Sequence, residues 1–381
     1  MDTIDNFFLP PHCAYRDCAQ FHAPGENTWF FKCGTHSTKA HGIVQRFKCR
    51  LCCRTFSRQT FDLDFCAKKR INWQDICSVV KNCISDRAYA RHIQVAPSTV
   101  GHKLSRLSKW SQLYHHQQIK DHKLRENVCA DGIETFVTSQ FYPGHVNLLV
   151  GSESQFSYGW DFCFLRRKGR MTDAQKAKRA QIEMTWKIPR GALKKSFQRG
   201  VAKPLAKLGS QTILEKVIIN TDEHPLYSKA LTEDKSLASL FSEGICIHQT
   251  VNSKDHRDTN SPLFSVNYMD REIRKDLANH VRETTRHSQE PNMMMDRMTV
   301  YLVQHNTEKR FRIKAPKGMG TKHWIIAGIR PETVINPRKG KFRQRPWFTE
   351  DFEESFKILW KREIPRPHGT PKRIQANFWM A

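Results

Sequence analysis

The chain has 381 residues, of which 63 are Lys or Arg and 37 are Asp or Glu, so its formal net charge is +26. This length suits two or three modules rather than one small domain. No apolar run approaches the roughly 20 residues that span a bilayer, and the first residues, MDTIDNFFLPPH, lack the regions of a signal peptide. We expect a cytoplasmic protein that binds a polyanion such as nucleic acid; the alternative is a merely basic housekeeping protein.

The cysteines are concentrated near the N-terminus, where six of the 12 lie in the first 53 residues. Cys13 and Cys18 form one close pair, and Cys49 and Cys52 form a second close pair after a long spacer. Two thiolate pairs on two turns can converge on one tetrahedral Zn²⁺, as in a zinc ribbon. The second pair lies in RFKCRLCCRTFS, among basic and aromatic residues. We therefore predict a nucleic-acid-facing zinc ribbon over residues 10–60.

Other ligand sets remain open for this zinc site. Cys33 and His36 could replace one pair, His22 could join, and Cys53 could compete with Cys52. The remaining alternative is a set of free thiols in a reduced cytosol.

The segment 71–112 predicts two helices joined by a tight turn. Ser85 can cap a helix over residues 87–92, and a turn around 94–97 leads into a second helix. Polar and basic residues are expected on the outer face of that second helix: Ser98, Thr99, His102, Lys103 and Arg106. This is the helix-turn-helix arrangement of DNA-binding proteins; a plain helical hairpin is the alternative. A linker helix is expected over 110–125.

From residue 126 onward the pattern changes to strands. ENVCADGIETFV, HVNLLVGSE and YGWDFCFLRR predict a meander of three strands. A basic helical stretch over 172–199, a buried strand over 216–220, a strand in GICIHQTVNSK and a long helix over 263–287 follow. This is the order of an RNase H-like α/β core, which we place at 126–308. The fold class is therefore α/β, with an RNase H-like mixed sheet behind a zinc ribbon and an all-α helix-turn-helix domain.

Three acids occur where such a core carries its metal ligands. Asp131 lies on the first strand and Asp222 follows the fourth, while the late helix supplies a third acid. Phosphoryl transfer by two metals needs converging carboxylates, and hard oxygen ligands suit Mg²⁺ or Mn²⁺. An Asp before Gly is usually a turn residue, but an Asp ending an apolar strand gains nothing from packing.

The third acid is a choice among Asp270, Glu272 and Glu283. Asp270 shares a helical stripe with Ile273 and Leu277, which should pack on the sheet. Glu272 is expected on the polar side, and Glu283 points away from the stripe. We therefore assign Asp270, with Glu283 second.

The sequence lacks GxxxxGK[ST], so we expect no nucleotide cofactor. It also lacks the GxSxG motif that forms the nucleophile elbow of α/β-hydrolases. The C-terminal region, 309–381, has 18 Lys or Arg against 6 Asp or Glu. Its RKGKFRQR segment (338–345) could follow a DNA backbone or form a solvated tail.

Together these motifs resemble bacterial insertion-sequence transposases with an N-terminal zinc finger and a DDE/D catalytic core. The resemblance covers about residues 10–310 and rests on CRLCCRTFSRQTF, SDRAYARHIQVAPSTV, VCADGIETF, VIINTDEHPLY and NYMDREIRKDLANHVRET, in that order. It implies Mg²⁺-dependent cleavage at element ends and joining to target DNA by a bacterial, nucleoid-associated enzyme. A dimer or larger assembly on DNA is expected by analogy. The alternatives are a DNA-binding regulator with an inactive core and an RNase H-type nuclease without strand joining.

Overall fold

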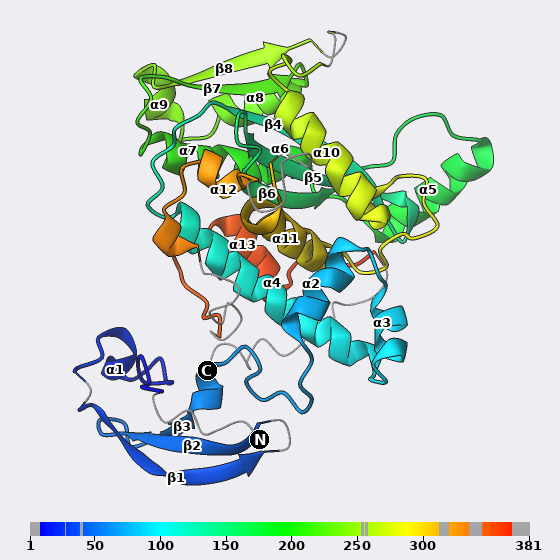
Figure 1. Ribbon diagram of the computed structural model, residues 1–381. Helices are drawn as coiled ribbons and strands as arrows, with labels where there is room; N and C mark the ends of the chain where they lie inside the picture. Colours follow the sequence, from blue (N-terminus) through cyan, green and yellow to red (C-terminus); the bar gives the residue numbers. More distant parts are fainter. Residues whose placement is uncertain are drawn as a thin grey trace. The chain divides into compact units, whose positions relative to one another are not determined.

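A computed structural model describes residues 8–26, 28–38, 41–252, 255, 258–311, 320–334 and 345–367. The described residues form two compact units (Figure 1). The first contains those of Met1–Ile76 and Ile335–Thr349, and the second those of Cys77–Val334 and Glu350–Arg373. Helix α2, Trp73–Lys81, begins in the first unit and ends in the second.

The first unit is a small antiparallel sheet with an aromatic core. Its strands pair in the order β1-β2-β3, and the elements are α1 Ala19–His22, β1 Phe30–Thr38, β2 Gly42–Cys49, β3 Thr55–Ser57 and the 3₁₀ turn η1 Arg58–Phe61. Phe47 pairs with Phe56 across β2 and β3, and their rings lie 6.0 Å apart. Trp29, Phe30 and Phe61 complete a buried cluster around them. Aromatic burial of this kind stabilises a sheet too small for a large aliphatic core.

The second unit is built on a five-stranded mixed sheet. Its order is β6-β5-β4-β7-β8, formed by β4 Val128–Val137, β5 Ser139–Gly151, β6 Ser157–Phe164, β7 Val217–Asp222 and β8 Cys246–Val251. The strands β4, β5 and β6 form an antiparallel meander, whereas β7 and β8 run parallel to β4. The predicted mixed α/β class, with three strands followed by two more, is confirmed.

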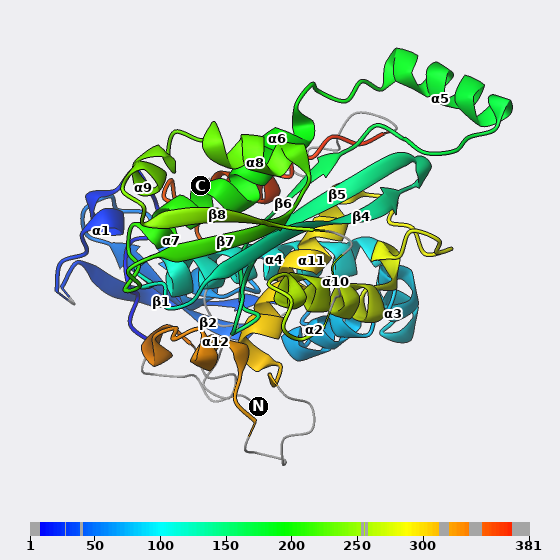
Figure 2. The ribbon, with the colours of Figure 1, turned by 90° about the horizontal axis from the view of Figure 1, so that it is seen from above.

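Helices cover both faces of this sheet (Figure 2). One face carries α6 Ala192–Phe197, the π-helical turn η2 Gln198–Ala202, α7 Lys203–Gly209 and α8 Pro225–Thr232, while α9 Ala238–Ser242 lies against β8. The other carries α10 Phe264–Asp276, the 3₁₀ turn η3 Ala278–His280, α11 Pro291–Glu308 and α13 Glu354–Lys361. Trp160 marks this second face, because its indole donates to Thr299 of α11. The remaining elements are α3 Asp86–His92, α4 Pro97–Ile119, α5 Asp173–Thr185, α12 His323–Ile326 and η4 Pro331–Thr333.

Three predicted helices differ from those observed. The linker helix expected over 110–125 is the continuation of α4, which runs unbroken to Ile119 because it packs along the buried helix α11. The basic stretch 172–199 is two helices, α5 and α6, separated at Pro189, whose ring cannot continue a helix. The long helix expected over 263–287 ends at Asp276, where Leu277 leaves the helical region.

The predicted RKGKFRQR segment lies outside the described residues except for Arg345, which is buried in the first unit. Across the described parts of the chain, no helix combines the length and apolar character needed to cross a membrane.

Candidate metal-binding sites

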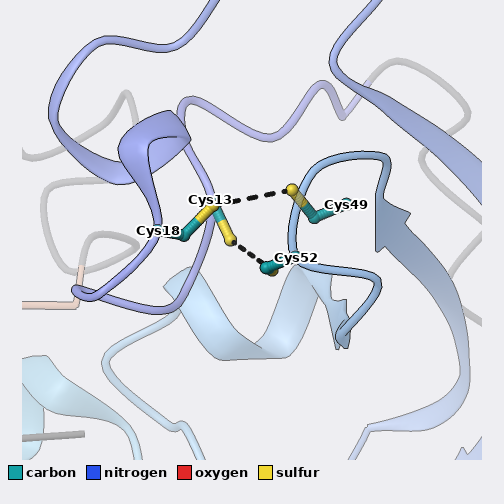
Figure 3. Close-up of side chains that lie close together, drawn as sticks. All are labelled: Cys13, Cys18, Cys49 and Cys52. Atoms are coloured by element: carbon teal, nitrogen blue, oxygen red, sulfur yellow. Dashed lines mark hydrogen bonds between the residues drawn. The ribbon is translucent and has the colours of Figure 1, made fainter.

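Four cysteines from two turns of the first unit come together (Figure 3). The sulfur atoms of Cys13 and Cys52 lie 3.7 Å apart, those of Cys18 and Cys49 lie 3.8 Å apart, and all four fall within 4.8 Å of one another. A tetrahedral Zn²⁺ with bonds of about 2.3 Å holds its sulfurs about 3.8 Å apart. The four thiols therefore fit a structural metal such as zinc.

Backbone hydrogen bonds shape the two turns that present these thiols. The amide of Cys13 donates to Gln20 and the amide of Cys18 donates to Tyr15. In the second turn the amide of Cys49 donates to Arg54. These bonds hold each pair of sulfurs on one side of its turn, so little further ordering is needed when a metal binds.

The alternative ligands lie outside this cluster. Cys53 is exposed and directs its thiol to the carbonyl of Arg50. The Nε2 atom of His22 faces the carbonyl of Arg16. Cys33 and His36 are residues of β1 and are absent from the metal-ligand group found in the described residues.

The local charges favour a thiolate at one of the four positions. Burial raises the pKa of Cys52, but hydrogen bonds from the backbone and side chain of Arg54 outweigh this effect and bring the pKa to about 7. Burial raises the pKa of Cys13. A thiolate is the form that binds a metal, and the hydrogen bonds from Arg54 favour that form at Cys52.

The first two predicted acids lie on neighbouring parallel strands. In the register of β4 and β7, Ala130 pairs with Thr221, so Asp131 and Asp222 are the next residues along each strand. Neighbouring strands are about 4.8 Å apart. Paired residues also point to the same face, and the partner of Asp131 across β5 is Leu148, which pairs with Trp160 on the α11 side. Both carboxylates therefore belong to one edge and one face of the sheet.

A buried polar network next to Asp131 was not anticipated from the sequence. Tyr227 of α8 lies near the Asp131 side chain, and its hydroxyl lies 3.4 Å from Nε2 of His145. Burial first, and then the charges of Asp131 and Asp222, raise the pKa of Tyr227. Tyr227 therefore stays protonated and can donate to the carboxylate. The signals in the sequence were the Tyr shortly after NTDEH and the polar residues inside a buried strand.

Gly132 makes room for this network. A Cβ atom at this position would lie 1.8 Å from Nε2 of His145. Burial also lowers the pKa of His145 to about 4, so its imidazole is neutral. The Asp131-Gly132 pair therefore lies inside β4, where Gly serves close packing and forms no turn.

The candidates for the third acid occupy three different environments. Asp270 is half-buried on α10 and its Oδ1 pairs with Arg274 at 2.7 Å. Glu272, expected on the polar side, is buried and pairs with Lys275 at 2.8 Å and with Lys309. Glu283 is exposed in the segment after η3, beyond the end of the helix. In the described chain, no third His, Cys, Asp or Glu joins Asp131 and Asp222 closely enough to form a metal-ligand group.

The five residues expected on an outer DNA-facing surface share helix α4 but not its exposed face. Ser98 and His102 are exposed, and Thr99 and Arg106 are half-buried. Lys103 is only 4% exposed, which corrects its expected place on the outer face. The reason is the continuous packing of α4, which turns this side of the helix inward.

No protein-family model and no curated protein matches this chain.

Proposed function

We propose that this protein is a DNA transposase of the DDE/D type, with Asp131, Asp222 and Asp270 as ligands of two catalytic Mg²⁺ or Mn²⁺ ions. The observation that carries this proposal is the placement of Asp131 and Asp222 at matching positions of two parallel strands, on one face of the sheet. An antiparallel meander followed by two parallel strands is also the strand order of an RNase H-like core, which supports the same interpretation.

The course of α10 along β4 supports Asp270 as the third ligand. Near its start, the backbone of Val266 hydrogen-bonds the Cys129 thiol, and beyond its end the carbonyl of Asn279 accepts from Thr135 at 3.1 Å. The helix therefore follows β4 from residue 129 towards residue 135. Asp131 is two strand residues beyond Cys129, a distance of roughly 7 Å. The same distance along α10 corresponds to about 4.5 helical residues. Counted from Val266, the residue opposite Cys129, this position falls next to Asp270.

The donor set fits hard divalent cations, since carboxylate oxygens are the ligands that Mg²⁺ and Mn²⁺ prefer. Two such ions, when bound, would stabilise the charge on the attacking and leaving oxygens of a phosphodiester. Tyr227 lies near the Asp131 carboxylate and is itself fixed by stacking on Phe197, with ring centroids 4.3 Å apart. This chain therefore orients its first carboxylate with residues from the opposite helical layer.

Two further parts of the chain suit recognition of DNA ends. Helices α3 and α4 are joined by a four-residue turn, residues 93–96. Ser85 caps the start of α3 by accepting from the amide of Ala88. We interpret them as a helix-turn-helix with Ser98, Thr99, His102 and Arg106 as DNA contacts, and Lys103 as a supporting residue. The four-cysteine unit would add a second, zinc-stabilised DNA-binding module, and the +26 charge suits the phosphate backbone.

Cleavage of the element's own ends tests this proposal. The zinc-loaded full chain is incubated with Mg²⁺ and duplex DNA from the borders of its gene. Cleavage at an inverted repeat is expected, and Asp131→Asn or Asp222→Asn should lower its rate at least about 10³-fold, or about 4 kcal/mol. A matched control is Asp121→Asn, an exposed acid after the end of α4. Equal rates for Asp131→Asn and the control would contradict the proposal.

One observation favours a second candidate, a DNA-binding regulator with an inactive core. The carboxylate of Asp270 is paired with Arg274, and a carboxylate held by a guanidinium is a poorer metal ligand. If the protein is a regulator, we expect it to bind end DNA without cleaving it in either Mg²⁺ or Mn²⁺. If it is a transposase, we expect both binding and cleavage of end DNA.

A further inference from the structure

The chain leaves the sheet between β6 and α6 to form a basic arm, residues 166–190, around helix α5. The arm has nine Lys or Arg and two acidic residues, and α5 has no buried residue. Figure 2 shows α5 extending beyond the end of the β4–β5 hairpin. An exposed helix that contributes nothing to the core and carries this charge suits contact with a polyanion.

Specific contacts fix the base of this arm to the sheet. Arg166 binds both carboxylate oxygens of Glu183, at 2.7 and 2.9 Å. The ring of Trp186 packs edge-on against Tyr142 at 6.0 Å and Phe164 at 5.2 Å. Bidentate pairs and edge-to-face aromatic contacts impose a definite geometry, so the base of the arm is preorganised.

A pocket of about 410 Å³ lies at this base. Its cationic side chains are Arg166, Arg167, Arg179 and Lys187, against one carboxylate, Glu183. Its apolar lining includes Phe141, Ile182 and Trp186. Cations next to aromatic surface are the combination that binds a single nucleic-acid strand, with phosphate on the charges and the base on the rings.

We propose that this pocket binds an unpaired nucleotide of DNA. The volume suits one nucleotide-sized ligand, whereas a base pair stacked within a duplex cannot enter a concave site of this size. The net charge of the lining selects an anion, and the aromatic surface distinguishes a nucleotide from a simple phosphate. This inference rests on the proposed function and adds a contact with unpaired strands to it.

The position of the pocket suits DNA that also reaches the carboxylates. Asp131 lies five residues before Phe136 on β4. Phe136 pairs with Pro143 of β5, which is two residues from the pocket residue Phe141. Five strand residues span roughly 17 Å, or about five nucleotides at 3.4 Å each. A DNA strand attached at the carboxylates would therefore place an unpaired nucleotide at the pocket about five positions away.

Fluorescence of 2-aminopurine in a single-stranded oligonucleotide tests the pocket. The zinc-loaded full chain is titrated in buffer without Mg²⁺ and without chelator, so that neither cleavage nor loss of zinc interferes. Binding should change the fluorescence. Trp186→Ala should abolish this change and weaken binding about tenfold, while Trp186→Phe should keep most of both. Lys187→Gln should lower the salt dependence of binding by about 0.7 in logarithmic slope.

Lys235→Gln is the matched control, because Lys235 is exposed in the same unit but lies outside the arm. Lys187→Gln changes only an exposed side chain, so it keeps the test decisive even if Trp186→Ala loosens the arm. Fluorescence and salt slope that stay at the wild-type level in both variants would overturn the inference. So would displacement of the oligonucleotide by polyglutamate of equal charge, which indicates an acidic peptide as the ligand.

The outcomes separate this inference from the proposed function. If the wild type cleaves end DNA but the pocket variants bind the oligonucleotide normally, only the proposed nucleotide pocket is overturned. If the wild type never cleaves DNA but its oligonucleotide binding depends on the pocket, only the proposed transposase function is overturned.

Discussion

The four-cysteine cluster and the acidic edge of the sheet are both candidate metal sites, but only the first has all its ligands close together in the described chain. Its four sulfurs lie within 4.8 Å of one another. At the acidic edge, Asp131 and Asp222 are placed by strand register, whereas the carboxylate of Asp270 is engaged by Arg274.

The difference follows from how each site is built. Each thiol pair belongs to one short turn, and the β1–β2 hairpin joins the two turns, so local structure completes the site. The acids come from elements far apart in the chain, and their mutual repulsion opposes a close approach without cations. We infer that the first site stabilises a fold, while the second is completed only when metal and DNA supply compensating charge.

The largest effect is expected from the thiol cluster. Cys49→Ser removes one of four sulfur ligands, and structural zinc contributes about 10–16 kcal/mol of binding free energy in small domains. Zinc content should fall from about one ion per chain, and amide hydrogen exchange should accelerate in β1, β2 and β3. Cys53→Ser is the control, since its thiol lies outside the cluster. Zinc retained by Cys49→Ser would show that the cluster is not the metal site.

The next effect sharpens the assignment of the third acid. Asp270→Asn should slow end cleavage at least about 10²-fold, because loss of an outer-shell partner alone costs about 10–100-fold and a direct ligand costs more. Its thermal stability should change little, since an (i, i+4) surface pair contributes about 0.3–0.5 kcal/mol. Full activity in Asp270→Asn with loss in Glu283→Gln would move the assignment to Glu283.

Glu272→Gln should show the opposite pattern, with a stability loss of about 1.5–3 kcal/mol and little direct effect on metal binding. Burial raises the pKa of Glu272, but hydrogen bonds from Lys275 and Lys309 outweigh it and hold the pKa below its usual value. The stabilisation is therefore full above the unfolded pKa of about 4.3 and disappears as pH falls through the folded pKa. Urea unfolding of both proteins at several pH values measures it. A stability difference that grows on acidification would contradict this account.

The smallest effect is expected from Tyr227→Phe. It removes the hydroxyl that lies near Asp131 and faces His145, and it leaves the stacking on Phe197, so stability should fall by about 1 kcal/mol. If Tyr227 positions the carboxylate, the variant needs more Mg²⁺ for half-maximal cleavage while its rate at saturating metal changes less. If the Mg²⁺ concentration for half-maximal cleavage is unchanged, the role of Tyr227 is purely structural.

Local patterns in the sequence predicted the parts of the molecule that local structure forms. The cysteine spacing identified the four thiols that converge. The β-branched and aromatic runs located the strands, and the Asp at the end of an apolar run marked the edge of β7. These signals depend on neighbouring residues, which a sequence displays directly.

Features that depend on tertiary packing could not be predicted in the same way. Lys103 and Glu272 were expected to be exposed polar residues, yet both are buried. For Glu272 the compensating partner, Lys309, is 37 residues away. The end of α10 and the contact between Tyr227 and Asp131 likewise depend on elements that meet only in the folded unit.

The central claim is that Asp131 and Asp222 jointly hold divalent cations. Electron paramagnetic resonance of Mn²⁺, titrated into the zinc-loaded full chain with end DNA, measures this most directly. The account predicts that Asp131→Asn and Asp222→Asn each weaken Mn²⁺ binding at least about tenfold, whereas the exposed control Asp121→Asn leaves it unchanged. Wild-type Mn²⁺ affinity in both strand variants would contradict the account.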